Sequence, residues 1–177
     1  SNVTVLSQNG VVASDNPLAS AVGAEVLRKG GSAADAGVAT LLTLGVVNPF
    51  ASGLGGGGFC IHRDAASGDA VAVDFRETAP MAASHKRFGR LAWRDVVHPA
   101  WEVAHHGFYV GELLPERLRA RAQDLATREH FVEAFQQDED WVTAYSWLTR
   151  RDLAKTLAKI RDEGPDVMRK GPIVDAI

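Results

Sequence analysis

The sequence contains one cysteine, Cys60, which excludes an intrachain disulfide and any metal cluster held by several cysteines. A buried, inert thiol is the expected state of this side chain. No apolar run reaches the roughly 18 to 20 residues of a membrane-spanning helix, because the longest candidate, residues 33–47, contains Asp35 and two glycines. The formal net charge of −3 gives no electrostatic basis for binding nucleic acid or an anionic membrane. What remains is an ordinary composition for one globular domain spanning residues 1–177.

Several motifs of catalysis and ligand binding are also missing. The glycine run at residues 53–58 lacks the lysine and Ser/Thr of a P-loop, and neither a GxSxG elbow nor an HExxH motif occurs. His105 and His106 are adjacent, so on a helix their side chains point in different directions and a shared metal is not expected. His98 and His130 have no partners at ligand spacing. We therefore predict no cofactor site and no metal site, and the residues alone reveal no nucleophile.

The stretch that organises the chain begins with the glycine run at residues 53–58. Without Cβ atoms, this run lets backbone or substrate approach closely and allows positive φ angles. Residues 59–63 and 70–75 have the aromatic and β-branched content of strands, and a Ser-Gly turn signal lies between them. The sequence therefore predicts a β-hairpin that directly follows a glycine-rich turn.

Arg76 stands at the end of this hairpin. By the alternation of a strand, Val71 and Val73 lie on one face, whereas Asp74 and Arg76 lie on the other. A guanidinium at a strand end suits a planar carboxylate, because its donors form a rigid fork. An ion pair with Asp74 or Glu77 at the surface is the alternative. The pattern gives a candidate carboxylate-binding residue and leaves this alternative open.

Helix signals surround the hairpin. Asn16 and Pro17 predict the start of one helix, and Ser32 is expected to cap a second at residues 33–46, which is almost entirely small or apolar. Further helices are expected at residues 93–106, 113–128 and 151–163, short strands at residues 3–6 and 10–13, and a linker at residues 81–84. The order of these elements indicates helices packed in a layer on a largely antiparallel sheet.

Several motifs, in order over most of the chain, resemble the large subunit of the γ-glutamyltranspeptidase family. They are GVVASDNPLAS at residues 10–20, LRKGGSAADA at 27–36, LGVVNP at 44–49, SGLGGGGF at 52–59, RETAP at 76–80, FGRLAW at 88–93, Pro99-Ala100, Gly107-Phe108, DLAKTL at 152–157 and GPI at 171–173. The second is a version of the family's K-x-G-G-N-A-x-D-A signature, and RETAP is close to its most distinctive large-subunit motif. By the number and order of these motifs, the chain is identified as a member of the family.

The resemblance implies an α+β fold, the four-layer αββα sandwich of the N-terminal nucleophile hydrolases, which two chains cut from one precursor form together. The family's nucleophile is a threonine that self-cleavage exposes at the N-terminus of the small subunit, where its own α-amine can act as the base. This threonine belongs beyond Ile177, so no catalytic residue is expected in this chain. The arginine of the RETAP motif holds the α-carboxylate of the γ-glutamyl donor, and by residue match that role falls on Arg76.

The chain departs from the family pattern between Ser84 and His85. Members normally carry a glycine-rich segment resembling G-G-L-x-V-G-V-P-G between the RETAP and F-G-x-L-x-W motifs, whereas here Ser84 is followed directly by His85. Either the segment is deleted or the two residues are joined across a gap, and the well-matched flanks favour the gap. The match is also poor at residues 140–150.

The implied activity is cleavage of the γ-glutamyl amide of glutathione-like donors, through an acyl-enzyme, with transfer to water or to an amino acid or peptide. Two alternatives stay open. One is a cephalosporin acylase of the same superfamily, which removes a glutaryl-type side chain and can use a serine. The other, from a different class, is an inactive or binding-only homologue. The implied partners are the small subunit and a small-molecule substrate, with no nucleic acid and no membrane span, in a periplasmic or secreted location, with a cytoplasmic one left open.

Overall fold

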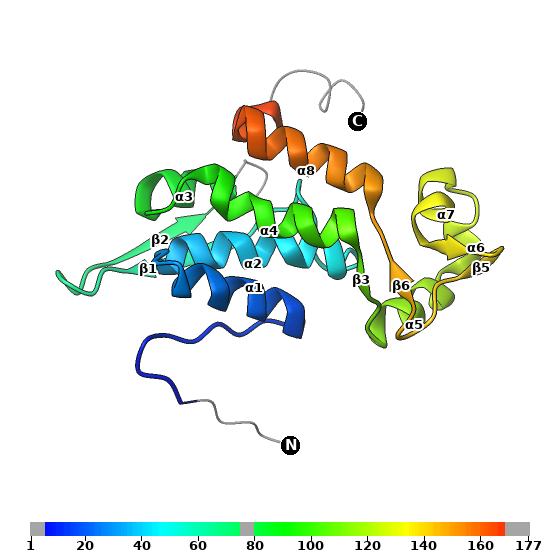
Figure 1. The fold of residues 1–177 in the computed structure, drawn as a ribbon, viewed down its shortest axis with the longest axis horizontal. Coiled ribbons are helices and arrows are strands. Elements are labelled where there is room, and N and C mark those ends of the chain that lie inside the picture. Colours follow the sequence, from blue (N-terminus) through cyan, green and yellow to red (C-terminus); the bar gives the residue numbers. More distant parts are fainter. Residues whose placement is uncertain (1–5, 75–79, 169–177) are drawn as a thin grey trace.

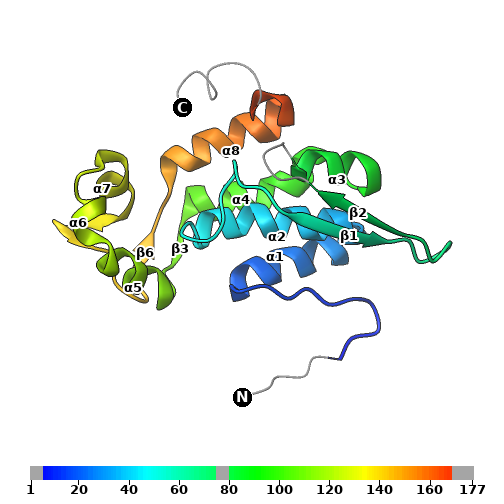
Figure 2. The same cartoon turned by 180° about the vertical axis from the view of Figure 1, so that it is seen from behind.

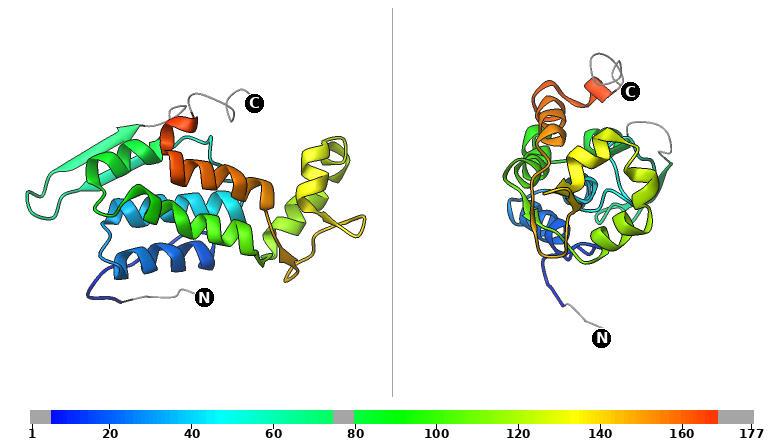
Figure 3. Two further views of the ribbon diagram at one scale, coloured as in Figure 1. Left: turned by 45° about the horizontal axis from the view of Figure 1, so that its top comes forward. Right: turned by 90° about the vertical axis from the view of Figure 1, so that its right-hand side faces the viewer.

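The computed structural model describes residues 6–74 and 80–168 and arranges them around a layer of long helices (Figure 1). The helices of this layer are α1 (Pro17–Arg28), α2 (Ala33–Val47), α4 (Trp93–His106) and α8 (Arg151–Glu163). Helix α2 packs between α1 and α4, and α8 packs on the other side of α4, as the views in Figure 1 and Figure 3 agree. Within the described residues, no helix is both long and apolar enough to cross a bilayer.

Local signals explain where the first two helices begin and end. The Asn16 side chain accepts hydrogen bonds from the N–H groups of Leu18 and Ala19, at 2.9 and 3.4 Å, and Pro17 occupies the first helical position. After α1, Gly30 adopts a φ of 88°, which glycine reaches without strain. Ser32 then caps α2 by accepting from the N–H of Asp35 at 3.1 Å. These contacts confirm the predicted starts of both helices.

The core lies on and around α2. Almost every residue of this helix from residue 35 to residue 47 is buried, and its neighbours α1, α4 and α8 contribute buried aliphatic side chains. The largest apolar side chains under 2% exposed are Val26, Leu42, Val46, Val96, Val97, Val110, Val142 and Leu157. A helix that is apolar all round is stable only when other elements cover it, and here helices do so on both flanks.

The predicted hairpin is present and antiparallel. Strand β1 (Phe59–Arg63) pairs with β2 (Ala70–Asp74), with Phe59 opposite Asp74 and Arg63 opposite Ala70. Figure 2 shows the hairpin projecting alongside α2 and α3. In the turn, Gly68 has a φ of 78° and the Asp64 carboxylate accepts from two backbone N–H groups at 2.8 and 2.9 Å. The turn chemistry therefore fixes the register of the strands.

The two faces of the hairpin differ in how far other residues shield them from solvent. On the inner face, the His62 ring stacks on Phe88 of α3 (Pro80–Phe88), with ring centroids 3.9 Å apart. On the outer face, Phe59 and Ile61 are 69% and 77% exposed. Cys60 is only half-buried, which corrects the expected buried thiol, because the described elements cover the hairpin incompletely.

Three sequence-based expectations about elements are wrong. Residues 81–84 belong to helix α3 rather than to a linker, because their small and long-chain residues favour a helix. Residues 10–13 form no strand. The helix expected at residues 113–128 is split into α5 (Leu113–Ala120) and α6 (Ala122–Leu125), since Arg121 between them departs from helical angles, with φ −124° and ψ 17°.

A smaller lobe follows α4, visible beside the helical layer in Figure 3. It comprises α5, α6, α7 (Glu129–Phe135) and two short strand pairs, namely β3 (Phe108–Tyr109) with β6 (Trp147–Leu148) and β4 (Gln136–Gln137) with β5 (Asp140–Trp141). The chain leaves this lobe into α8 and the 3-10 turn η1 (Pro165–Met168). The core packing is continuous between the lobe and the helical layer.

Candidate functional site

The predicted substrate-binding residue, Arg76, lies outside the described residues, as does Glu77. The structure nevertheless describes the end of the hairpin from which the chain runs to Arg76. Phe59 pairs with Asp74, so the glycine run before Phe59 and the residues after Asp74 leave the hairpin at the same end. Arg76 follows Asp74 by two residues in the sequence. The glycine run therefore adjoins the end of the hairpin at which the described part of β2 stops, two residues before Arg76 in the sequence.

A cavity of about 390 Å³ adjoins the glycine run. It is lined by Leu41, Pro49, Phe50, Ala51, Ser52, Gly53, Gly56, Gly57 and Met81. Leu41 comes from α2 and Met81 from α3, while the other lining residues come from the segment between α2 and β1. None of the described lining side chains is charged, so any charge that recognises a ligand here has to come from elsewhere.

The glycine run supplies open backbone to this cavity. A Cβ atom added at Gly53 or Gly55 would meet nothing within 4 Å. Glycine is therefore not required at these two positions by crowding from neighbouring atoms, and its absence of a side chain leaves open space. Positive φ angles, which glycine also permits, occur instead at glycines such as Gly30 and Gly68. Gly56 donates to the Gly53 carbonyl at 3.1 Å, whereas in the described structure the N–H groups of Gly53 and Gly57 donate to no protein acceptor. Gly53 and Gly57 both line the cavity, so its described wall includes backbone N–H groups that have no protein acceptor.

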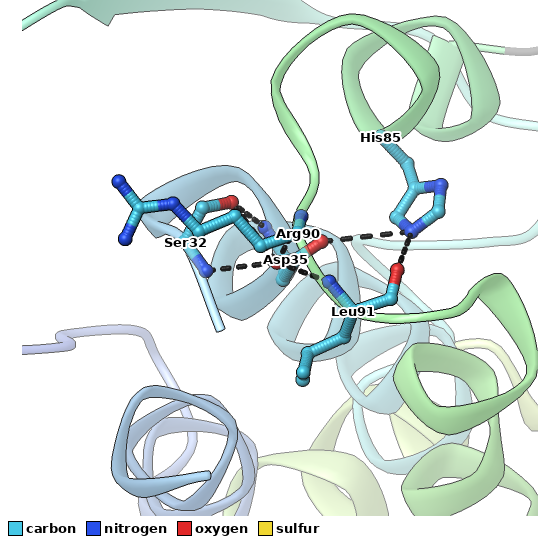
Figure 4. A network of polar contacts seen from close by, with 5 residues as sticks. All are labelled: Ser32, Asp35, His85, Arg90 and Leu91. Atoms are coloured by element: carbon cyan, nitrogen blue, oxygen red, sulfur yellow. Dashed lines mark hydrogen bonds and ion pairs between the residues drawn. The ribbon is translucent and has the colours of Figure 1, made fainter. Parts of the chain in front are cut away.

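Asp35 of the K-G-G-S-A-A-D-A motif forms a buried network near the other end of α3 (Figure 4). Asp35 Oδ2 accepts hydrogen bonds from the N–H of Ser32 at 2.8 Å and from the Oγ hydroxyl of Ser32 at 3.0 Å. The same oxygen accepts from the N–H groups of Arg90 at 2.8 Å and Leu91 at 3.2 Å. Burial by itself would raise the pKa of Asp35, but the backbone hydrogen bonds from Arg90, Ser32 and Leu91 outweigh it and hold that pKa below its usual value. The motif thus builds the scaffold around an ionised carboxylate.

Two glycines make room for this network. A Cβ atom at Gly31 would lie 2.7 Å from Val26 Cγ1 and 2.8 Å from the Val26 carbonyl oxygen. A Cβ atom at Gly89 would lie 2.5 Å from the His85 carbonyl oxygen and 2.7 Å from Asp35 Oδ1. Both positions therefore need glycine because of close approach rather than because of backbone angles.

His85 completes the network and was not foreseen from the sequence as a site residue. Its Nε2 lies 2.9 Å from the Leu91 carbonyl oxygen and 3.5 Å from Asp35 Oδ1. The signal that could have found it is its place three residues before the FGRLAW motif, which contains Arg90 and Leu91.

The remaining histidines make no metal site within residues 6–74 and 80–168, where no group of three or more His, Cys, Asp or Glu side chains could hold an ion. The rings of His105 and His106 stand at 89° to each other. His105 and His98 both stack on Trp101, with ring centroids 4.9 and 5.2 Å away. These histidines pack against an aromatic ring.

Comparison with solved structures defines the class of fold. The chain superposes on the γ-glutamyltranspeptidase of Helicobacter pylori with a TM-score of 0.90 and 25% identity, over 98% of this chain and 60% of that one. It also superposes on a cephalosporin acylase from Bacillus halodurans with a TM-score of 0.87 and 21% identity, over 99% of this chain and 40% of that one, which shows the fold alone. The chain therefore has the α+β fold of the N-terminal nucleophile hydrolases, to which it contributes a helical layer and the β1–β2 hairpin.

Sequence comparison then identifies the family. The family model described as gamma-glutamyltranspeptidase matches residues 19–85 and 81–177. The chain is 36% identical to a glutathione hydrolase of Aspergillus flavus, over 95% of this chain and 33% of that protein. It is 31% identical to the glutathione hydrolase proenzyme of Escherichia coli, over 98% of this chain and 36% of that protein. The chain belongs to the gamma-glutamyltranspeptidase family, and it spans about a third of the length of these curated relatives.

Proposed function

We propose that this chain is part of the large subunit of a γ-glutamyltransferase or glutathione hydrolase, in which it binds the γ-glutamyl donor. The observation that carries the proposal is the cavity beside the glycine run, at the end of the hairpin from which the chain continues to Arg76, in a member of this family. The described wall is uncharged and offers the N–H groups of Gly53 and Gly57. An arginine added to such a wall would supply the charge for an α-carboxylate.

The proposed chemistry needs a second chain. A threonine at the N-terminus of the small subunit attacks the γ-carbonyl carbon of the donor with its hydroxyl oxygen, and its own α-amine takes the proton. The amide C–N bond breaks, the leaving amine receives the proton, and the glutamyl group stays on the threonine as an ester. Water or the amine of an amino acid or peptide then attacks this ester and releases the threonine. The large-subunit contribution is binding and orientation of the donor.

The acylase alternative has less support. Similarity to the Bacillus halodurans acylase rests on 21% identity, whereas the curated relatives named glutathione hydrolase reach 36%. A glutaryl carboxylate and an α-carboxylate both suit an arginine, so the identity of the nucleophile is the sharper criterion. We further propose a periplasmic or secreted location, by analogy with the family.

A segment that the relatives keep is proposed to be missing at residues 84–85. The family model matches in two pieces that meet at residues 81–85. The alignments to the relatives run over 202 and 209 positions, although the chain has 177 residues. Both facts agree with a deletion or a join at this point.

The first experiment is intact-mass analysis of the full-length expressed protein, with N-terminal sequencing of every chain. We expect two chains, the second opening with threonine, because self-cleavage exposes the nucleophile. A second chain opening with serine would favour the acylase. A single uncut chain would leave an inactive or binding-only homologue as the better description. The same masses test the junction at residues 84–85, since a further segment would add its mass to the large subunit.

A further inference from the structure

A second cavity, of about 520 Å³, lies where the smaller lobe meets the segment that follows α2. Pro49 and Phe50 line it from that segment, and helices α5, α6 and α7 supply all the other lining residues except Arg121, which stands between α5 and α6. Figure 3 shows this lobe beside the helical layer. The volume falls within the roughly 300–1000 Å³ of small-molecule sites, whose walls are mostly apolar with a few polar groups. The residues of the wall therefore indicate what the cavity can bind.

The wall of this cavity is apolar and rich in phenylalanine. Its buried part includes Leu118 and Phe135, which are 4% and 2% exposed. Phe50 and Phe131 remain 40% and 39% exposed. The rings of Phe131 and Phe135 lie 5.9 Å apart between centroids. Because aromatic rings pack on one another at separations of about 4.5–7 Å, with a gain beyond the buried area, the wall favours an aromatic occupant.

Arg117 and Arg121 give the cavity a positive charge. They are the charged residues of its described wall, which contains no carboxylate. Their spacing of four residues places them on one face at the end of α5. Both are exposed, and neither guanidinium forms an ion pair or a hydrogen bond with another described residue. Two unpaired guanidinium groups beside an apolar wall are complementary to an anion with an apolar body.

We propose that this cavity binds a small aromatic carboxylate, with its ring against Phe50 and Phe131 and its carboxylate on Arg117 and Arg121. The site does not depend on the proposed γ-glutamyl activity. Burial of the ring supplies contact area, whereas the hydrogen bonds from guanidinium to carboxylate select an anion over a neutral molecule of the same shape. A cation of that shape would be repelled by both arginines.

Calorimetric titration of the full-length protein with naphthalene-2-carboxylate tests the role of the charge. Naphthalene-2-carboxamide has the same ring and nearly the same shape without the charge, so it is the matched ligand. We expect saturable binding of the carboxylate, at least tenfold tighter than binding of the carboxamide. Raising the NaCl concentration from about 50 to about 500 mM should weaken binding of the carboxylate alone, because salt screens exposed charges.

Variants locate the ligand. Arg117→Gln and Arg121→Gln should each weaken binding of the carboxylate at least threefold and leave the carboxamide unchanged. Both side chains are exposed, so neither change should disturb folding. Arg119→Gln replaces an exposed arginine of α5 outside the cavity wall, and as the matched control it should change neither affinity. Phe131→Ala should weaken both ligands by a similar factor, because it removes a ring from the wall.

Three results would overturn the proposal: no saturable binding of the carboxylate, equal affinity for the carboxamide, or full affinity for the carboxylate in both arginine variants. The first result would follow if another segment of the full-length protein filled the cavity, and slow alkylation of Phe131→Cys by iodoacetamide would show this. The third result would mean that the carboxylate binds elsewhere, for example at the proposed donor site.

The binding measurement is separate from the test of the proposed function. A protein that binds the carboxylate through Arg117 and Arg121 but does not cleave a γ-glutamyl anilide would refute the proposed activity and keep this site. A protein that cleaves the anilide without binding the carboxylate would do the reverse.

Discussion

At Asp35, a charged side chain is stable inside the protein because backbone N–H groups replace water around it. Two of those N–H groups belong to Arg90 and Leu91, more than fifty positions away in the sequence. The third is that of Ser32, which also caps the helix. Through these hydrogen bonds, the Asp35 carboxylate links the turn between α1 and α2 to the segment before α4.

The lowered pKa of Asp35 predicts a pH dependence with a definite sign. Because the folded protein holds this proton less tightly than the unfolded chain, the ionised group contributes stability that is fully present above the ordinary value of 3.8 and is lost as the pH falls through the folded pKa. Asp35→Asn should lower the free energy of unfolding by roughly 1–3 kcal/mol at pH 7. The gap to the wild type should narrow below pH 3.8, measured by urea unfolding at several pH values.

A suitable control is Asp15→Asn, because Asp15 is exposed. It should change the free energy of unfolding little at any pH. A gap between Asp35→Asn and the wild type that persists unchanged down to pH 3 would contradict this assignment of the stabilising charge.

Arg76 gives the residue-scale prediction for activity. Arg76→Ala would remove a charge-assisted, bidentate contact to the donor carboxylate and should cost about 2–4 kcal/mol of transition-state binding, roughly a 30- to 1000-fold loss of kcat/KM for a γ-glutamyl anilide. Arg76→Lys should restore little, because an ammonium cannot form the paired contact. Arg63→Ala, at the other end of the hairpin, is the matched control. Near-normal kcat/KM in either Arg76 variant would show that the donor carboxylate is bound elsewhere.

Single residues show how far the sequence alone could lead. It predicted that Ser32 caps a helix at residues 33–46, and the capping contact between Ser32 and Asp35 confirms that local part. It could not reveal the contacts with Arg90 and Leu91, or the role of His85, because no periodicity encodes which distant N–H groups will meet a carboxylate. The assignment of Arg76 stays a prediction.

Among the elements, those predicted correctly carry their own start and stop signals. The caps at Asn16 and Ser32 and the turn at Gly68 predict α1, α2 and the β1–β2 hairpin from a few adjacent residues. Helix α3 begins at Pro80, and its small residues resemble a linker until the tertiary contacts with α2 are known. The break at Arg121 between α5 and α6 likewise has no proline or glycine to announce it.

The hairpin gives a prediction at the scale of an element. Ile61 is 77% exposed on its outer face, whereas the inner face packs on Phe88. A two-stranded hairpin is marginal in water, so further sheet structure should cover the outer face in the full-length protein. Ile61→Lys would then bury an unpaired charge and lower the free energy of unfolding by about 3 kcal/mol or more. Thermal unfolding of the full-length protein measures this.

Ser67→Lys is the matched control, because Ser67 lies in the exposed turn of the same hairpin. It should leave the unfolding temperature nearly unchanged. If Ile61→Lys is equally harmless in the full-length protein, the outer face stays in contact with water and the expected covering layer is wrong.

For the whole molecule, the described residues form a continuous helical layer and core, whereas their strands form three separate two-stranded pairs, of which the β1–β2 hairpin is the longest. That imbalance agrees with a chain that spans about a third of the curated relatives. The sequence motifs predicted the family and the fold class correctly, because they recur in order over most of the chain. The number of layers in the complete protein follows from the fold class rather than from these residues.

The exposed outer face of the hairpin also bears on whether two chains stay associated after the backbone between them is cleaved. On the proposed assembly, the bond broken during maturation is one covalent link. If the sheet structure expected over the exposed Phe59 and Ile61 belongs to the small subunit, its contact with them remains after the cut. Dissociation would return those side chains to water, at a cost of about 25 cal/mol for each Å² of apolar area. The two chains should therefore sediment, elute and unfold as one particle, so that maturation changes the number of chain ends without creating a separable subunit.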